Sequence, residues 1–138
     1  MQVFISRSQV DEPLAEQLTS ELRKAGLQVW SPRELFPGDN WRLETGKALE
    51  ASDVMVALFS RGAHDSEVAR DVQYALTFGK YEGRVIPVLI DFVTFEVGKD
   101  VPWVLLRMDP LYIQRSEPDY AEIVRRVQQA AAGSHASA

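Results

Sequence analysis

Two acidic side chains, Glu67 and Asp71, stand four residues apart in a segment whose apolar residues recur at helical spacing. Side chains four positions apart project from one face of a helix, so both carboxylates are expected to point the same way. Acids on helices mostly form solvated surface pairs, and Arg61 and Arg70 are close enough in sequence to neutralise these two. The alternative is a pair of carboxylates beside a site at the end of a sheet.

Other kinds of catalysis lack the residues that they need. The chain has no cysteine, which excludes disulfides, thiol nucleophiles and cysteine metal sites. It has two histidines, and His135 lies in a tail of small residues. A zinc site or a Ser-His-Asp arrangement would therefore depend on His64 alone, and we expect no metal site.

The common nucleotide-binding motifs are also missing. A Walker A loop requires a lysine followed by Ser or Thr, but Gly46-Lys47 is followed by Ala48 and Gly79-Lys80 by Tyr81. No GxGxxG occurs, which removes the usual dinucleotide fingerprint although not the binding of nicotinamide nucleotides in general.

Length and charge limit the class of protein. The 138 residues correspond to one domain, since domains average about 150 residues. A net charge of -5 argues against a dedicated nucleic-acid binder, which usually carries a basic face. No apolar run reaches the roughly 18 residues of a membrane span, and the first residues do not resemble a signal peptide. We expect a cytoplasmic protein without a membrane partner.

Short apolar runs alternate with longer amphipathic segments. The predicted strands are Val3–Ser6, Leu27–Trp30, Val54–Phe59, Val85–Ile90 and Leu111–Ile113. The predicted helices run from an acidic cap at Asp11-Glu12-Pro13 to Gly26, and over Trp41–Ala51, Ser66–Phe78 and Tyr120–Ala132; Leu43 and Leu76 are expected to face inward.

This alternation predicts a fold. Strands that are apolar on both faces indicate an all-parallel sheet covered on both sides. We therefore predict a flavodoxin-like three-layer α/β/α fold with a five-stranded parallel sheet in the order 2-1-3-4-5, over residues 1–132, with 133–138 as a flexible tail or linker. Pro87 suggests an edge position or a bulge for its strand.

Polar residues follow the predicted strands, at the edge where this fold binds ligands. Ser6, Arg7 and Ser8 follow the first strand, and Ser60 follows the third. The turn-rich loop after the second strand contains Glu34, Leu35, Phe36, Pro37, Gly38 and Asp39. Its apolar pair Leu35-Phe36 either anchors the loop in the core or lines a site.

The order of several motifs resembles the Toll/interleukin-1 receptor (TIR) domain, especially its bacterial members, over residues 2 to about 129. The matching segments are Val3-Phe4-Ile5-Ser6 with Asp11, Gly26 to Trp30 with Leu35 to Trp41 (strand B and the BB loop of the family), Ala48 to Val54 with the strand that ends at Ser60, and Val68 to Leu76 with Arg84 to Leu89.

The resemblance implies two classes of function. Many TIR domains cleave NAD⁺ between nicotinamide and ribose and release ADP-ribose or a cyclic variant, often in anti-phage defence; others are non-enzymatic adaptors that assemble through the BB loop. It implies NAD⁺ as the substrate, no further cofactor, and other TIR domains as partners in a homo-oligomer or filament that activates the enzyme. The alternative is a TIR interaction module without activity.

The residues of the family site carry over with differences. The enzymatic family has a glutamate in its third helix, usually within W-V-x-x-E; here that position is Asp71, and Glu67 stands where the family has tryptophan. The resemblance thus implies Asp71 as the principal catalytic carboxylate and Glu67 as the reserve. The implied substrate-binding residues are Ser6, Arg7, Ser8, Leu35, Phe36, Pro37, Gly38 and Trp41, and the implied interaction loop contains Glu34, Pro37, Gly38 and Asp39. Arg7 replaces the usual aromatic and either pairs with the diphosphate of the substrate or lies on the surface.

Overall fold

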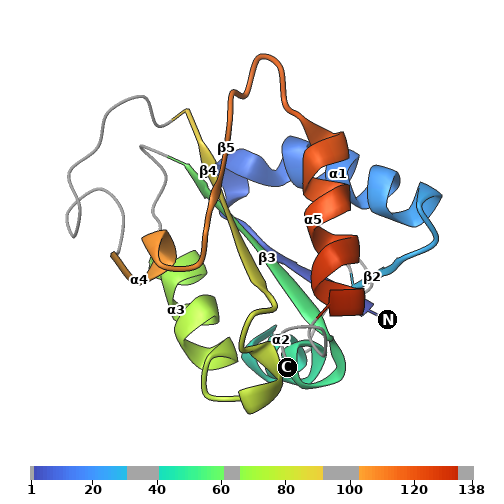
Figure 1. The fold of residues 1–138 in the computed structure, drawn as a ribbon. Coiled ribbons are helices and arrows are strands. Elements are labelled where there is room, and N and C mark those ends of the chain that lie inside the picture. The colour runs from blue at the N-terminus through green and yellow to red at the C-terminus, as the bar shows by residue number, and fades with distance from the viewer. Residues whose placement is uncertain (1, 31–40, 61–65, 92–102, 134–138) are drawn as a thin grey trace.

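The computed structural model describes residues 2–30, 41–60, 66–91 and 103–133 (Figure 1). Its strands are β1 (Gln2–Ser6), β2 (Gln28–Trp30), β3 (Val54–Ser60), β4 (Val85–Ile90) and β5 (Leu111–Ile113). Its helices are α1 (Glu12–Lys24), α2 (Trp41–Ala51), α3 (Ser66–Ala75), α4 (Trp103–Leu106) and α5 (Tyr120–Gly133), with short 3-10 turns η1 (Gln9–Asp11) and η3 (Gly79–Tyr81). Every strand pairs in parallel, in the order β2-β1-β3-β4-β5, which confirms the predicted fold.

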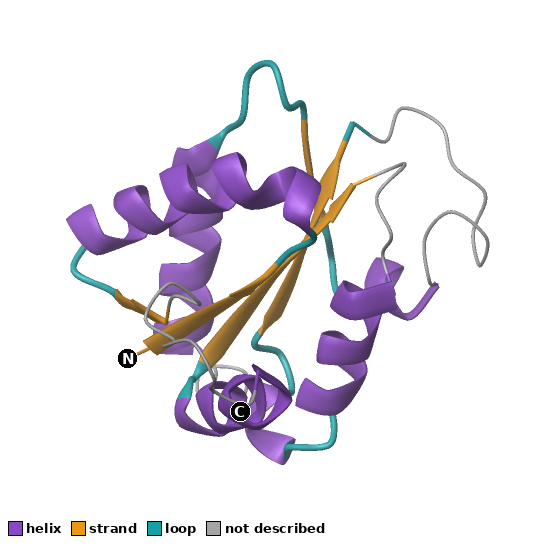
Figure 2. Cartoon of the chain, turned by 180° about the vertical axis from the view of Figure 1, so that it is seen from behind, coloured by secondary structure: helices purple, strands orange, loops and turns teal. Residues whose placement is uncertain are grey.

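The sheet is covered on both faces (Figure 2). Every residue of β3 and β4 is buried, and successive side chains go to opposite sides. One core joins Val56 and Leu58 to α1 and α5; the other joins Ala57 and Phe59 to α2, α3 and α4. Since apolar packing fills both faces, polar chemistry is confined to the ends of the strands.

Helix α1 shows how the local sequence produces these layers. Pro13 lies in its first turn, where a missing N–H costs no helical hydrogen bond. Its buried stripe consists of Leu14, Ala15, Leu18 and Leu22. Gly26 ends the helix with φ +88°, a conformation that favours glycine, and the chain turns directly into β2.

The predicted edge position or bulge at Pro87 is wrong. Strand β4 lies between β3 and β5, and Pro87 pairs with Ala57 in an unbroken register. Strand β5 pairs only with Val88–Ile90, so Pro87 lies before the stretch of β4 that has neighbours on both sides. Proline is tolerated here because β5 does not extend to this position.

Two apolar residues expected to face inward are exposed. Leu43 is 53% exposed and Leu76 is 39% exposed. The buried residues of α2 near its end are Ala48 and Leu49, and α3 ends at Ala75, so Leu76 no longer follows the apolar stripe of that helix. The short helix α4 was also not predicted.

Tyr81 connects the turn before β4 to the end of α2 by hydrogen bonds. Its side chain is fully buried, and its hydroxyl donates to the backbone oxygens of Leu49 and, at 3.1 Å, Ser52. These carbonyls lie at the end of α2, where helical partners run out. Burial, and to a lesser degree the charge of Asp53, raise the pKa of Tyr81 above its ordinary value of 10.0.

Gly46 offers a stabilising substitution. A Cβ there would lie 3.6 Å from Tyr74 Oη, an ordinary contact, and alanine is the better helix former. We expect Gly46→Ala to raise the free energy of unfolding by about 0.5–1 kcal/mol in urea titrations. The matched control, Gly26→Ala, has open space around its Cβ but a positive φ, and should lower it by about 1 kcal/mol. Equal effects would contradict this account.

Tyr81→Phe should lower the free energy of unfolding by about 1–3 kcal/mol at pH 8, because two buried carbonyls lose their donor. A folded-state pKa above the unfolded one gives stability that is complete below pH 10 and declines as pH rises beyond it. Wild type should therefore lose about 1 kcal/mol relative to Tyr81→Phe between pH 8 and pH 11, measured by urea unfolding. A constant difference would exclude the burial of this phenol as the cause.

Candidate functional site

The carboxyl ends of the strands bring together residues from distant parts of the sequence. Ser6 ends β1, Ser60 ends β3, Asp91 follows β4, and Arg115 lies just beyond β5. Strand β1 lies between β2 and β3, so the strand order reverses between β1 and β3. In open parallel sheets, this reversal is where ligands bind.

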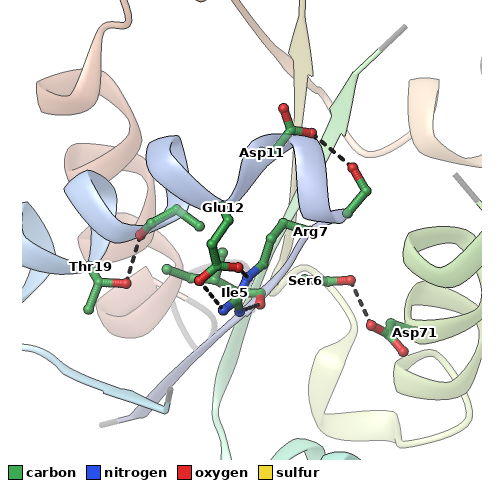
Figure 3. Close-up of polar contacts among 9 residues, drawn as sticks. Ile5, Ser6, Arg7, Asp11, Glu12, Thr19 and Asp71 are labelled. Carbon is green, nitrogen blue, oxygen red and sulfur yellow. Dashed lines mark hydrogen bonds and ion pairs between the residues drawn. The ribbon is translucent and has the colours of Figure 1, made fainter. Parts of the chain in front are cut away.

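Ser6 and Asp71 form a pair at this point. The Ser6 hydroxyl donates a 2.7 Å hydrogen bond to Asp71 Oδ2, across from β1 to α3 (Figure 3). Ser6 is 2% exposed, whereas Asp71 is partly exposed, on the same helix as the buried Val68 and Val72. Asp71 is therefore not a fully solvated surface acid; its carboxylate is bonded to Ser6 at the reversal point, and the residue as a whole is partly exposed.

Glu67 lies in the first turn of α3, four residues before Asp71, and its side chain is outside the described residues. Its part in the site stays a prediction. The same holds for the loop from Glu34 to Asp39, which lies outside the described residues, and for the side chain of Trp41, the first residue of α2.

Arg7 turns away from Asp71 and forms a closed ion pair with Glu12 (Figure 3). Its Nε and Nη2 donate to the two Glu12 carboxylate oxygens at 2.9 and 3.1 Å, and its Nη1 donates to the backbone oxygen of Ile5 at 3.0 Å. The Arg7 side chain is 11% exposed. Contact with a diphosphate would thus require this fork to open, and the role of Arg7 in substrate binding stays a prediction.

Asp11 is a residue whose role the sequence did not suggest. It occupies the N-cap position of α1, but its side chain makes no cap hydrogen bond, contrary to the expected acidic cap. Asp11 is 0% exposed and accepts from Ser60 Oγ at 2.7 Å, Ser8 Oγ at 3.4 Å and Arg115 Nη2 at 2.5 Å. We call these four residues the Asp11 cluster.

The Asp11 cluster and the Ser6–Asp71 pair lie on opposite faces of the sheet. Ser60 lies two residues after Leu58 and four after Val56 in β3, so its side chain points to the same face as theirs, toward α1 and α5. Ser6 lies two residues after Phe4 in β1, so its side chain points to the same face as Phe4, toward α2 and α3. Ser8, predicted to bind substrate, therefore belongs to the cluster on the α1 side and donates to Asp11.

The described ranges contain neither a metal-binding cluster nor a membrane-spanning helix. There, no three His, Asp or Glu side chains gather in a way that could hold a metal ion. No helix of this part of the chain is long and apolar enough to span a bilayer.

A sequence profile described as "TIR domain" matches residues 3–126, so the chain belongs to the TIR domain family. Solved structures with a similar fold include a metazoan TIR-STING receptor from C. gigas in complex with 2′,3′-cGAMP, with a TM-score of 0.74 and 18% identity; the match covers 91% of this chain and 38% of the receptor. Among curated protein sequences, none matches the chain.

Two other solved structures are similar over most of the chain. The TIR domains of the activated Roq1 resistosome that recognises the effector XopQ have a TM-score of 0.59 and 23% identity, covering 94% of this chain and 80% of that one. A Clostridium botulinum CMP N-glycosidase, BcmB, has a TM-score of 0.62 and 17% identity, covering 93% and 98%. At these identities, the similarity shows the shared fold.

The hydrogen bond between Ser6 and Asp71 predicts an energetic coupling. In a double-mutant cycle of Ser6→Ala and Asp71→Ala, we expect a coupling energy of about 1–3 kcal/mol in urea unfolding, since the acceptor is charged and the donor buried. Pairing Ser6→Ala with Glu82→Ala, at the opposite end of the sheet, should give none. A coupling as small as in that control would mean that the two side chains do not bond in solution.

Proposed function

We propose that this TIR domain is an NAD⁺ glycohydrolase or cyclase that breaks the bond between nicotinamide and ribose, with Asp71 as its catalytic carboxylate. The observation that carries the proposal is the Ser6–Asp71 pair, in which the buried Ser6 bonds to the carboxylate of the partly exposed Asp71 where the strand order reverses. The family to which the chain belongs supports the choice of reaction.

The proposed reaction requires one negatively charged group beside the ribose. The bond between ribose C1′ and the nicotinamide nitrogen breaks with its electron pair going to nicotinamide, which leaves as a neutral molecule. Positive charge develops on the ribose, and a carboxylate beside it lowers the energy of that state. Water then adds at C1′ and releases a proton to give ADP-ribose, while attack by an adenine nitrogen gives a cyclic product.

Ser6 has a specific part in this mechanism. By donating to Asp71 Oδ2, it fixes the rotamer of the carboxylate and satisfies one of its oxygens. We include Arg7 in the proposed substrate pocket with the loop residues from Leu35 to Trp41; its contact with substrate requires the ion pair with Glu12 to open. We propose no metal or further cofactor, because NAD⁺ carries its own leaving group.

The fold is compatible with this class of reaction. BcmB, which shares the fold over nearly its whole length, is by its name an N-glycosidase that acts on CMP. We extend to this chain the type of bond broken, between a ribose carbon and a ring nitrogen, and not that substrate. A bacterial origin, a cytoplasmic location and a role in anti-phage signalling belong to the same proposal.

Nicotinamide release from NAD⁺ tests the proposal, measured by chromatography with and without a crowding agent. Asp71→Asn should lower kcat by at least ~100-fold, because the charge beside the ribose is lost while the shape is kept. Asp71→Glu should retain more activity than Asp71→Asn, since it keeps the charge. The control Glu82→Gln removes an exposed carboxylate at the opposite end of the sheet and should leave kcat unchanged.

Two outcomes would reject this function. One is the absence of nicotinamide release by the assembled wild-type protein; the other is wild-type release by the double variant Asp71→Asn, Glu67→Gln. Activity that survives Asp71→Asn and disappears in Glu67→Gln would transfer the catalytic role to Glu67.

A second candidate function, self-association as a TIR interaction module, is favoured by exposed apolar side chains on α2 and α3. Leu43 and Tyr74 are 53% and 46% exposed, and Tyr74 lies against Gly46, one turn after Leu43. The Roq1 TIR domains form part of a resistosome, which supports association between TIR domains in this family. We propose a second copy of this chain as the partner.

Association should be concentration-dependent in sedimentation velocity, and Tyr74→Glu should weaken it at least ~10-fold because a charge would be buried without a partner. Substitution of Pro37 or Trp41 should also weaken it. Assembly in the Asp71→Asn variant, without turnover, would show that the interaction function stands apart from the enzyme. A monomer at all accessible concentrations would reject it.

A further inference from the structure

The Asp11 cluster is an elaborate polar arrangement that the proposed reaction does not use directly. Asp11 is fully buried, and its carboxylate accepts hydrogen bonds from residues of three separate segments. Arg115 reaches it from 104 residues further along the chain, and the Arg115 side chain is 41% exposed. A buried charge needs such partners, so the residues around it are held in defined positions.

Two of the groups bonded to Asp11 lie at the ends of β1, which contains Ser6, and of β3, which precedes α3 and Asp71 in the chain. Ser8 lies two residues after Ser6, and Ser60 is the last residue of β3, the strand that precedes α3 and Asp71 in the chain. The carboxylate of Asp11 therefore bonds to the exit of β1 and to the exit of β3. These are the two strands between which the order of the sheet reverses.

Arg115 extends this arrangement along the edge of the sheet to the ends of β4 and β5. Its backbone N–H donates to Asp91 Oδ1 at 2.9 Å, and its Nε lies 3.8 Å from Asp91 Oδ2. The N–H of Asp91 donates to the Ile113 carbonyl at 2.9 Å. Asp91 adopts φ +62°, which aspartate tolerates better than most residues. Through Arg115, the exits of β4 and β5 are thus connected to Asp11.

We propose that Asp11 and Arg115 are positioning residues that set the spacing between the exits of β1 and β3, and thereby the placement of Asp71 on its substrate. This inference rests on the proposed NAD⁺-cleaving function. Both residues act from the opposite face of the sheet and touch no reacting atom. A displacement of about 1 Å at a catalytic group is enough to slow a reaction ~100-fold, so loosening the exits is sufficient to impair turnover.

The first test compares kinetics. Arg115→Gln and Ser60→Ala should each lower kcat for nicotinamide release by about 10- to 100-fold, with KM changed less than about threefold. Arg115→Lys keeps the charge and should recover part of the loss. Ser60→Ala removes a single hydrogen bond, so it keeps the test decisive if Arg115→Gln does not fold. The control Arg126→Gln breaks another Arg–Asp contact, with Asp109 before β5, and should leave kcat unchanged.

The second test needs no activity. The coupling between Ser6 and Asp71 from the double-mutant cycle is measured again in the Ser60→Ala and Arg115→Gln backgrounds, at a temperature where every variant is folded by circular dichroism. We expect it to fall to half or less of its wild-type value, since the pair loses its set distance. A merely structural role lowers overall stability and leaves this coupling intact.

The outcomes separate the two proposals. If wild type releases no nicotinamide, the proposed function fails, and the coupling measurement still decides whether the cluster positions the pair. An unchanged coupling in both backgrounds overturns the inference, and so does a wild-type kcat in Ser60→Ala and Arg115→Gln. A kcat loss in the Arg126→Gln control equal to that of Arg115→Gln would overturn it as well.

Discussion

The buried carboxylate of Asp11 constrains the whole ligand-binding edge of this domain. A charge with no exposure to water must be met by donors, and here these come from Ser8, Ser60 and Arg115. Three such donors converge only when β1 lies beside β3 and the chain beyond β5 returns toward α1. The ion pair is weak evidence for stability, since burying charges is costly, but removing one partner would leave the other charge buried without compensation.

The alternation of side chains along the strands places the Asp11 cluster and the Ser6–Asp71 pair on opposite faces of the sheet. In β1 and β3, successive side chains belong to opposite cores, so the end of the sheet has two polar faces. The face toward α1 contains the Asp11 cluster, which is internally satisfied. The face toward α3 contains Ser6 and the partly exposed Asp71. Rigid support on one face beside a partly exposed acid on the other suits a site that needs one well-placed charge.

Those parts of the fold that depend on local pattern were predictable from sequence. Apolar runs such as Val54–Phe59 identified buried parallel strands, and helix stripes identified the layers. The prediction from Pro87 was wrong because the tolerance of a strand for proline depends on how far the neighbouring strand extends. Ser6 and Asp71 were each predicted as site residues, but their bond spans 65 positions and emerges only from the topology. The contacts of Asp11 could not be predicted for the same reason, since nothing near it in sequence points to Arg115.

The pair also bears on the difference between this chain and the enzymatic pattern of its family. Aspartate places its carboxylate about 1.5 Å closer to the helix than glutamate does, by one carbon–carbon bond. In this structure, the Ser6 hydroxyl lies 2.7 Å from that carboxylate, so the end of β1 contacts the shorter side chain directly. A longer acid would extend past Ser6 or have to fold back. Whether Asp71 can do the work of a glutamate thus depends on the position of β1 relative to α3, and that position is what the contacts of Asp11 with Ser8 and Ser60 restrain.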